Sequence, residues 1–222
     1  MAKKIYLSPS EQPENCYSYG STNEKEQCCR ISAAAEKALK RNGFEVINAT
    51  ASTLSARCTE ADKWGADLYV PIHTNAFNGE VSGTRMFCYR LSGEGYKACQ
   101  AIYNVLAPFT PGKSENIKAS PGLYEVKTPK APTVYIEVDF HDVPDVAKWI
   151  IENAEEIGEV ICKGICNHYG VAYKAENTET KPETTGKLFR VQVGAYGVRE
   201  NAIAMQKKLA AAGFDAIIVE SK

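Results

Sequence analysis

The chain has 222 residues, with 26 Lys and Arg against 27 Asp and Glu, so its formal net charge at pH 7 is −1. Charges of both signs are interspersed along it, which argues against nucleic acid and against an anionic membrane surface as partners. No apolar run approaches the length of a membrane span, so no membrane insertion is expected. The length is sufficient for a full hydrophobic core in one or two domains.

Eight cysteines do not by themselves indicate a disulfide scaffold. The chain is longer than the small secreted domains that depend on disulfides, and no signal peptide precedes the first apolar run, which begins at Ile5. No CxxC pair is present, so the cysteines are expected to be packing residues rather than zinc ligands. The sequence therefore predicts a protein that is made in the cytoplasm with reduced cysteines.

Apolar runs alternate with amphipathic stretches through the first 170 or so residues. In chain order, this pattern predicts a strand at 4–7, a helix at 23–41, a strand at 44–47, a helix at 52–64, strands at 67–72 and 83–89, a helix at 95–106, paired strands near 123–126 and 134–140, and a long helix at 145–169. Such an order is typical of an α/β fold, here with a twisted, mostly parallel six-stranded sheet flanked by helices. A first domain over residues 1–171 is predicted.

The composition changes abruptly after this domain. Residues 172–187 have no apolar periodicity and predict a flexible linker. Beyond it, a strand at 188–193, a helix at 199–212 and a strand at 215–219 predict a small βαβ unit over residues 188–222. Because so short a unit offers little core, it is expected to need a partner.

The end of an apolar strand carries the first candidate for chemistry. Residues 67–72 predict a buried strand, and His73 follows them directly, before the small polar residues Thr74 and Asn75. The carboxyl ends of strands are where an α/β sheet presents its functional groups. A single histidine at such a place can also cap or hydrogen-bond a loop.

A carboxylate within an apolar strand is the second candidate. Glu137 lies between Ile136 and Val138, and a buried ionisable group is costly unless a metal, a partner or a reaction explains it. With period-two alternation, Glu137 shares one strand face with Asp139 and His141, so His141 is expected to reach the same site.

These groups converge if the topology is as predicted. Glu24 opens the helix at 23–41, and the turn after the first strand contains Gln12. One imidazole, carboxylates and a side-chain amide make a mixed N/O site that suits Zn²⁺ with an open water position. A further carboxylate would move the proton of that water. The alternative for Glu24 is a helix N-terminal acid that the helix dipole stabilises.

Residues 4–170 resemble the zinc-dependent N-acetylmuramoyl-L-alanine amidases of bacterial autolysins and phage endolysins. The motifs that carry the resemblance are IHTNA at 72–76, TNE at 22–24, LYEVK at 123–127 and YIEVDF at 135–140. The resemblance implies that Glu24 and His73 are zinc ligands, that Glu137 is the catalytic carboxylate, and that the cofactor is Zn²⁺. Asn75 is expected to position the substrate or the neighbouring loop.

One departure from the family concerns the first ligand. Where family members usually have a histidine in a DPGHG-like turn, this chain has Ser8-Pro9-Ser10-Glu11-Gln12, similar to the SPSxQ turn of a clostridial-type subgroup. The amide oxygen of Gln12 is the first choice for the missing ligand, Glu11 the second, and His141 from the neighbouring strand the third. A neutral oxygen ligand would lower zinc affinity.

Residues 188–222 resemble one half of a SPOR domain, a peptidoglycan-binding module. The motifs are FRVQVGAY at 189–196 and AAAGFDAIIV at 210–219. Since a SPOR domain consists of two such halves, the resemblance implies truncation or a homodimer in which two chains pair their C-terminal units.

The expected function is hydrolysis of the amide between N-acetylmuramic acid and the L-alanine of the stem peptide, in cell lysis or wall turnover. The expected partner is bacterial peptidoglycan, reached after release from the cytoplasm, as by a phage endolysin or, second, a host autolysin. Two other classes stay open: a wall-binding protein without catalysis, and a zinc peptidase that cuts within the stem peptide.

Overall fold

The first part of the chain alternates strands and helices. Its strands are β1 (Lys4–Pro9), β2 (Glu45–Asn48), β3 (Leu68–Asn75), β4 (Arg85–Cys88), β5 (Asn116–Ala119) and β6 (Tyr135–Phe140). Its helices are α1 (Glu24–Arg41), α2 (Leu54–Trp64), α3 (Gly93–Leu106), α4 (Tyr124–Lys127), α5 (Pro144–Glu152) and α6 (Ala154–Tyr169). The structure is a computed structural model that describes residues 2–51, 53–113, 116–176, 192–211, 214 and 216–220. It divides the chain into two compact units, Met1–Asn177 and Thr178–Lys222.

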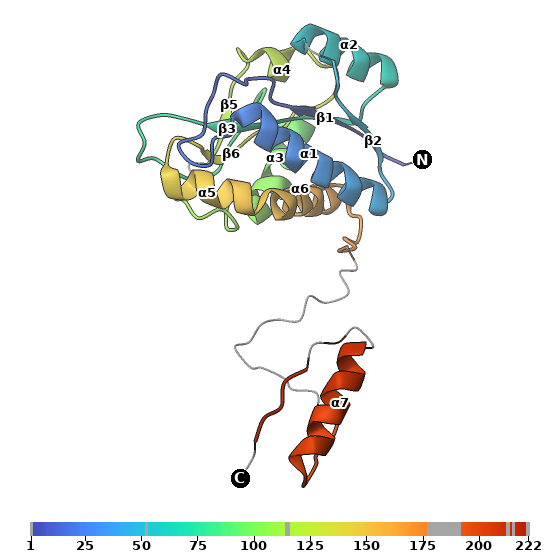
Figure 1. Cartoon of the computed structure of the whole chain (residues 1–222). Helices are drawn as coiled ribbons and strands as arrows, with labels where there is room; N and C mark the ends of the chain where they lie inside the picture. Colours follow the sequence, from blue (N-terminus) through green and yellow to red (C-terminus); the bar gives the residue numbers. More distant parts are fainter. Residues whose placement is uncertain are drawn as a thin grey trace. The chain divides into compact units, whose positions relative to one another are not determined.

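The six strands form one sheet in the order β2-β1-β3-β6-β4-β5 (Figure 1). Neighbouring strands are parallel except β4 and β6, which run antiparallel. This confirms the predicted mostly parallel six-stranded sheet flanked by helices. The interior strands β1 and β3 are buried along nearly their whole length, as expected for parallel strands covered on both faces.

Helices cover both faces of the sheet. The main core lies between one face and helices α1, α3, α5 and α6, and it includes Ile5, Leu7, Val70, Ile72 and Ile136. A smaller cluster on the opposite face places Tyr6 and Tyr69 against α2. Figure 1 shows α2 and α4 together on the side of the sheet away from α5 and α6. Successive residues of a strand therefore point into different environments, and this alternation decides which side chains reach the site below.

The predicted strand at 123–126 is wrong. Residues Tyr124–Lys127 form the short helix α4, and the sixth strand is instead β5, which pairs only with β4 at the edge of the sheet. Short apolar runs do not distinguish strand from helix by periodicity, and here the turn at Pro121-Gly122 precedes a single helical turn.

The predicted long helix at 145–169 is interrupted at Asn153. This residue ends α5 and precedes α6 with φ −117° and ψ 18°, and its side-chain amide donates to the carbonyl of Trp149 at 2.8 Å. An asparagine that bonds to the backbone of the preceding turn competes with a continuous helix. Among the described residues, no helix is both long and apolar enough to cross a bilayer.

The C-terminal unit contains helix α7 (Arg199–Ala211), which confirms the predicted helix there. Residue 215 of the predicted strand at 215–219 lies outside the described residues, and residues 216–220 have no regular secondary structure. Most of the other predicted strand, residues 188–191, lies outside the described residues, and Gln192 and Val193 are not in a strand. The helix is therefore the described secondary structure of this unit.

Candidate active site

His73 and Glu137 lie directly opposite each other on neighbouring parallel strands. The register of β3 and β6 pairs Ile72 with Ile136 and His73 with Glu137. Both isoleucines belong to the main core, so by alternation His73 and Glu137 leave the sheet on the opposite face. The ring of Tyr135 stacks on the imidazole of His73, with centroids 4.6 Å apart and planes 18° apart. The two residues predicted from separate strands are thus brought together.

Glu24 reaches the same imidazole from the start of α1. The helix begins there because the side chain of Asn23 accepts a hydrogen bond from the backbone N–H of Glu26 at 3.0 Å, which is a regular N-cap. Glu24 is 1% exposed, and its Oε1 lies 2.8 Å from Nδ1 of His73. The predicted ligand pair therefore stands in direct contact.

Glu137 is a carboxylate without a hydrogen-bond partner for one of its oxygens. Its Oε2 is buried and has no partner among the described residues. Burial raises the pKa of Glu137 to about 7, the positive charges of His73 and Arg85 oppose this, and Glu24 adds to it. A pKa near the operating pH is what a group needs to accept a proton and then donate it.

The carboxylates around His73 raise its pKa. Burial alone would lower its pKa, but interactions with Glu125 and Glu24, and the charge of Glu137, raise that pKa to about 9. Burial would raise the pKa of Glu24, but its contact with His73 lowers it. The site thus combines one imidazole with three carboxylates in a largely buried place.

The third carboxylate, Glu125, was missed by the sequence interpretation. It lies in α4 and is 3% exposed; its Oε1 accepts hydrogen bonds from Ser8 Oγ at 2.6 Å and from the hydroxyl of Tyr69 at 2.7 Å. Its Oε2 is 3.8 Å from Nε2 of His73. Burial raises its pKa, but the nearby His73 and the hydrogen bonds from Ser8 and Tyr69 lower it below its ordinary value. The signal in the sequence was an acidic residue between Tyr124 and Val126, read there as part of a strand.

The turn after β1 contributes indirectly. The side-chain amide of Asn15 donates to Oε1 of Gln12 at 2.5 Å and to Oε2 of Glu24 at 2.6 Å, so Asn15 bridges Gln12 and Glu24. Glu11, the second choice for the missing ligand, instead pairs with Arg57 at 2.8 Å and with Lys25 at 2.7 Å. Of these two predicted candidates, Gln12 is the one linked to the site.

His141 and Asn75 lie at the border of the site. Strand β6 ends at Phe140, and the pairing with β3 shifts between His73 and Asn75, so strict alternation does not extend to His141. Its Nδ1 is 2.9 Å from Thr74 Oγ1, and its ring stacks on a tyrosine, Tyr17, with centroids 5.0 Å apart. The carbonyl of Asn75 accepts from the backbone N–H of His141 at 2.8 Å. His141 therefore contacts the neighbour of His73 rather than His73 itself.

The donor set fits a divalent metal in part. Among the described residues, no three His, Cys, Asp or Glu side chains are gathered closely enough to hold a metal ion. The pair of His73 and Glu24 supplies one nitrogen and one oxygen. Glu137, whose Oε2 is buried without a hydrogen-bond partner among the described residues, is paired with His73 in the strand register. A third ligand of another type, such as the amide oxygen of Gln12, would complete a three-ligand zinc site.

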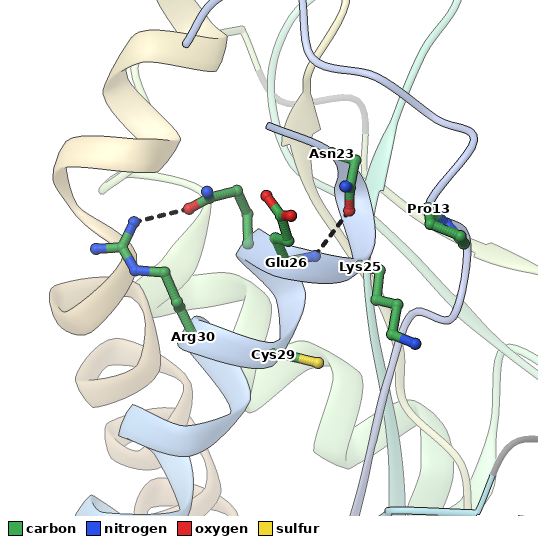
Figure 2. A pocket seen from close by; sticks show the side chains of 7 residues that line it. Pro13, Asn23, Lys25, Glu26, Cys29 and Arg30 are labelled. Carbon is green, nitrogen blue, oxygen red and sulfur yellow. Dashed lines mark hydrogen bonds between the residues drawn. The ribbon is translucent and has the colours of Figure 1, made fainter. Parts of the chain in front are cut away.

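A surface pocket lies beside this site, over the first two turns of α1 (Figure 2). It is lined by Pro13, Asn23, Lys25, Glu26, Gln27, Cys29 and Arg30. Figure 2 shows the N-cap bond of Asn23 at its edge, and a bond from Arg30 to Gln27. The pocket adjoins the helix start that carries Glu24, but the buried carboxylates do not line it.

Comparison with known proteins gives matches along most of the chain. The family model Amidase_3, N-acetylmuramoyl-L-alanine amidase, matches residues 11–167, and the SPOR domain model matches residues 169–220. An uncharacterized 38.4 kDa protein of Clostridium perfringens is 26% identical in an alignment of 167 positions that covers 70% of this chain and 48% of that protein. This chain thus spans about half the length of that relative. The sporulation-specific N-acetylmuramoyl-L-alanine amidase of Bacillus subtilis (strain 168) is 21% identical in an alignment of 223 positions that covers 97% of this chain and 84% of that protein.

Solved structures share the fold. The catalytic domain of CwlV, an N-acetylmuramoyl-L-alanine amidase from Bacillus (Paenibacillus) polymyxa var. colistinus, has a TM-score of 0.69 at 19% identity, over 77% of this chain and 99% of that chain. The CwlD amidase from Clostridioides difficile, solved with the GerS lipoprotein, has a TM-score of 0.64 at 20% identity, over 76% of this chain and 98% of that chain. With the family model matched over residues 11–167, the chain belongs to the N-acetylmuramoyl-L-alanine amidase family.

Proposed function

We propose that the chain is a zinc-dependent hydrolase that cleaves the amide between N-acetylmuramic acid and the L-alanine of the peptidoglycan stem peptide. The observation that carries the proposal is the register of β3 and β6, which sets His73 opposite Glu137 with Glu24 2.8 Å from the imidazole. Family membership supplies the substrate, since Amidase_3 is a family of peptidoglycan amidases.

In this proposal His73, Glu24 and Gln12 hold the zinc ion. When bound, zinc supplies a Lewis acid that polarises the scissile carbonyl and makes water more acidic. Glu137 takes the proton from the attacking water and passes it to the leaving amine of L-alanine. Its pKa of about 7 suits both transfers. Asn75, at the end of β3, positions the substrate or the adjoining loop.

Product analysis of digested peptidoglycan tests this function. The amidase reaction releases new L-alanine amino termini and leaves free lactyl carboxylates on the glycan. A peptidase that cuts within the stem peptide would leave L-alanine attached to the glycan and release other amino termini. Finding only the latter would reject the amidase assignment while keeping hydrolysis.

A wall-binding protein without catalysis is the second candidate, because one observation favours it. The turn at Ser8–Gln12 has no histidine, and Glu11 in it is engaged by Arg57 and Lys25. Elemental analysis of the purified chain separates the candidates, since an amidase of this mechanism retains zinc. A chain that binds peptidoglycan, holds no zinc and releases no amino termini would be the binding protein.

We further propose that the protein acts on the cell wall and that two chains pair through the C-terminal unit. The SPOR match over residues 169–220 supports wall binding. In the same unit, apolar side chains of Val193, Ile217 and Val219 are 59%, 86% and 60% exposed. Large apolar side chains exposed together favour association with another surface.

A further inference from the structure

Glu125 is a buried carboxylate that the proposed reaction does not use. It is the acid of the short helix α4, and it approaches His73 on the side of Nε2, whereas Glu24 contacts Nδ1. Its two oxygens have different surroundings. Oε1 receives two hydrogen bonds, from Ser8 and Tyr69, while Oε2 is directed to the imidazole at 3.8 Å.

The strands fix the orientation of this carboxylate. Ser8 belongs to β1 and Tyr69 to β3, so Glu125 is attached to two neighbouring interior strands of the sheet. Ser8 Oγ in turn accepts a hydrogen bond from Nη1 of the fully buried Arg57 at 3.1 Å. Arg57 also donates to the carbonyl of Pro9 at 2.5 Å. Ser8 and Pro9, at the turn without the usual family histidine, are thus hydrogen-bonded to Arg57, and Ser8 connects this network to Glu125.

The other edge of the imidazole faces the groups of the proposed reaction. Nδ1 lies 2.8 Å from Glu24, and the charges that act on Glu137 are those of His73, Glu24 and Arg85. Nδ1 is therefore the nitrogen on the side of the proposed ligand Glu24, and it would be the one to meet a metal held there. A metal-bound histidine commonly donates its other N–H to a carboxylate, which fixes the orientation of the ring and makes it a better ligand.

We propose that Glu125 is the positioning residue for His73: it accepts the Nε2–H, so that Nδ1 is presented to a metal between Glu24 and Glu137. Closing the 3.8 Å separation between Oε2 and Nε2, with Oε1 still held by Ser8 and Tyr69, converts the present ion pair into this hydrogen bond. With Tyr135 stacked on the ring face, the imidazole is then held on its face and on both edges. The inference rests on the proposed function only for the identity of the metal.

The test uses the full chain, labelled with ¹⁵N, and two variants. Glu125→Gln keeps an oxygen that can accept from Ser8 and Tyr69, but it removes the charge and places an amide toward His73. Glu60→Gln is the matched control, because Glu60 accepts a tyrosine hydroxyl, that of Tyr6, at 2.5 Å without contact to His73. Zinc affinity is measured by competition with a chelator, and the Nε2–H proton of His73 is followed by NMR in the zinc-free chain.

The expected result is a loss of zinc affinity of about 10- to 100-fold in Glu125→Gln, together with loss of the slowly exchanging, downfield Nε2–H signal. Glu60→Gln retains both. Glu125→Gln with wild-type zinc affinity would overturn the proposal, whatever its NMR signal. If the wild-type chain retains no zinc, the proposed function fails, and the NMR comparison alone decides whether Glu125 orients His73.

Discussion

The three carboxylates near His73 have pKa values shifted in opposite directions by their surroundings. Contact with His73 lowers the pKa of Glu24 and of Glu125, whereas burial raises that of Glu137 to about 7. Carboxylates that stay ionised suit charge pairing and metal binding, and one that titrates near neutrality suits proton transfer. The division of roles proposed above follows this difference.

The raised pKa of Glu137 predicts a dependence of stability on pH in the zinc-free protein. A carboxyl whose pKa is higher in the folded state than its ordinary 4.5 stabilises the fold fully below that value, and this contribution is lost as the pH rises through about 7. Glu137→Gln does not titrate and keeps similar packing. Its free energy of unfolding relative to the wild type is therefore expected to rise by on the order of 2 kcal/mol between about pH 5 and about pH 8.

Urea unfolding of both zinc-free chains at the two pH values measures this difference. The comparison between variants cancels the titration of other groups to a first approximation. An unchanged difference would show that Glu137 has an ordinary pKa, and its assignment as the proton-transfer group would lose its electrostatic support.

The proposed replacement of the missing histidine ligand by Gln12 predicts how strongly different variants retain zinc. His73→Ala is expected to lose zinc, and Gln12→Ala to weaken zinc retention more than Glu11→Ala or His141→Ala, because Asn15 links Gln12 to Glu24. Elemental analysis after dialysis gives the ranking. If His141→Ala is the worst of the three alternatives, the missing ligand is the residue that follows β6, and the assignment of Gln12 is wrong.

At the level of elements, the sequence predicted those whose apolar patterns are strong. The buried run of β3 and the capped start of α1 were both predicted, and Glu24 is the first residue of its helix. The predicted strand at 67–72 was too short, because β3 continues through His73 to Asn75. β5 was missed because it is a short, mostly exposed strand that pairs on one side only. Helix α4 was misread because tertiary hydrogen bonds from Ser8 and Tyr69 to Glu125 hold it, and no local pattern reveals such bonds.

The packing of α6 on α1 predicts the effect of a single methyl group. A Cβ on Gly158 would lie 2.6 Å from Cβ of Ala34 and 2.6 Å from the backbone nitrogen of Ala35. Gly158→Ala is therefore expected to destabilise the chain by about 1–3 kcal/mol despite the better helix propensity of alanine. Gly122→Ala is the control, since a Cβ there meets nothing within 4 Å. Thermal unfolding of the two variants decides; equal stability would mean that the two helices pack less closely.

At the level of the whole molecule, the exposed apolar side chains of the C-terminal unit predict self-association. The full chain is expected to form dimers at tens of micromolar, and a chain of residues 1–171 to remain monomeric, since the proposed pairing surface is removed. Light scattering on both chains measures their masses. A full-length chain that stays monomeric would contradict the proposed pairing and leave wall binding to a single C-terminal unit.

The central claim is that Glu137 transfers protons beside a zinc ion held by His73 and Glu24. The most direct measurement is the rate at which Glu137→Gln releases L-alanine amino termini from purified peptidoglycan, together with its zinc content. The account predicts a rate about 10²- to 10⁴-fold below that of the wild type with unchanged zinc, and a wild-type rate for the control Glu60→Gln. A Glu137→Gln chain that digests peptidoglycan at the wild-type rate would contradict it.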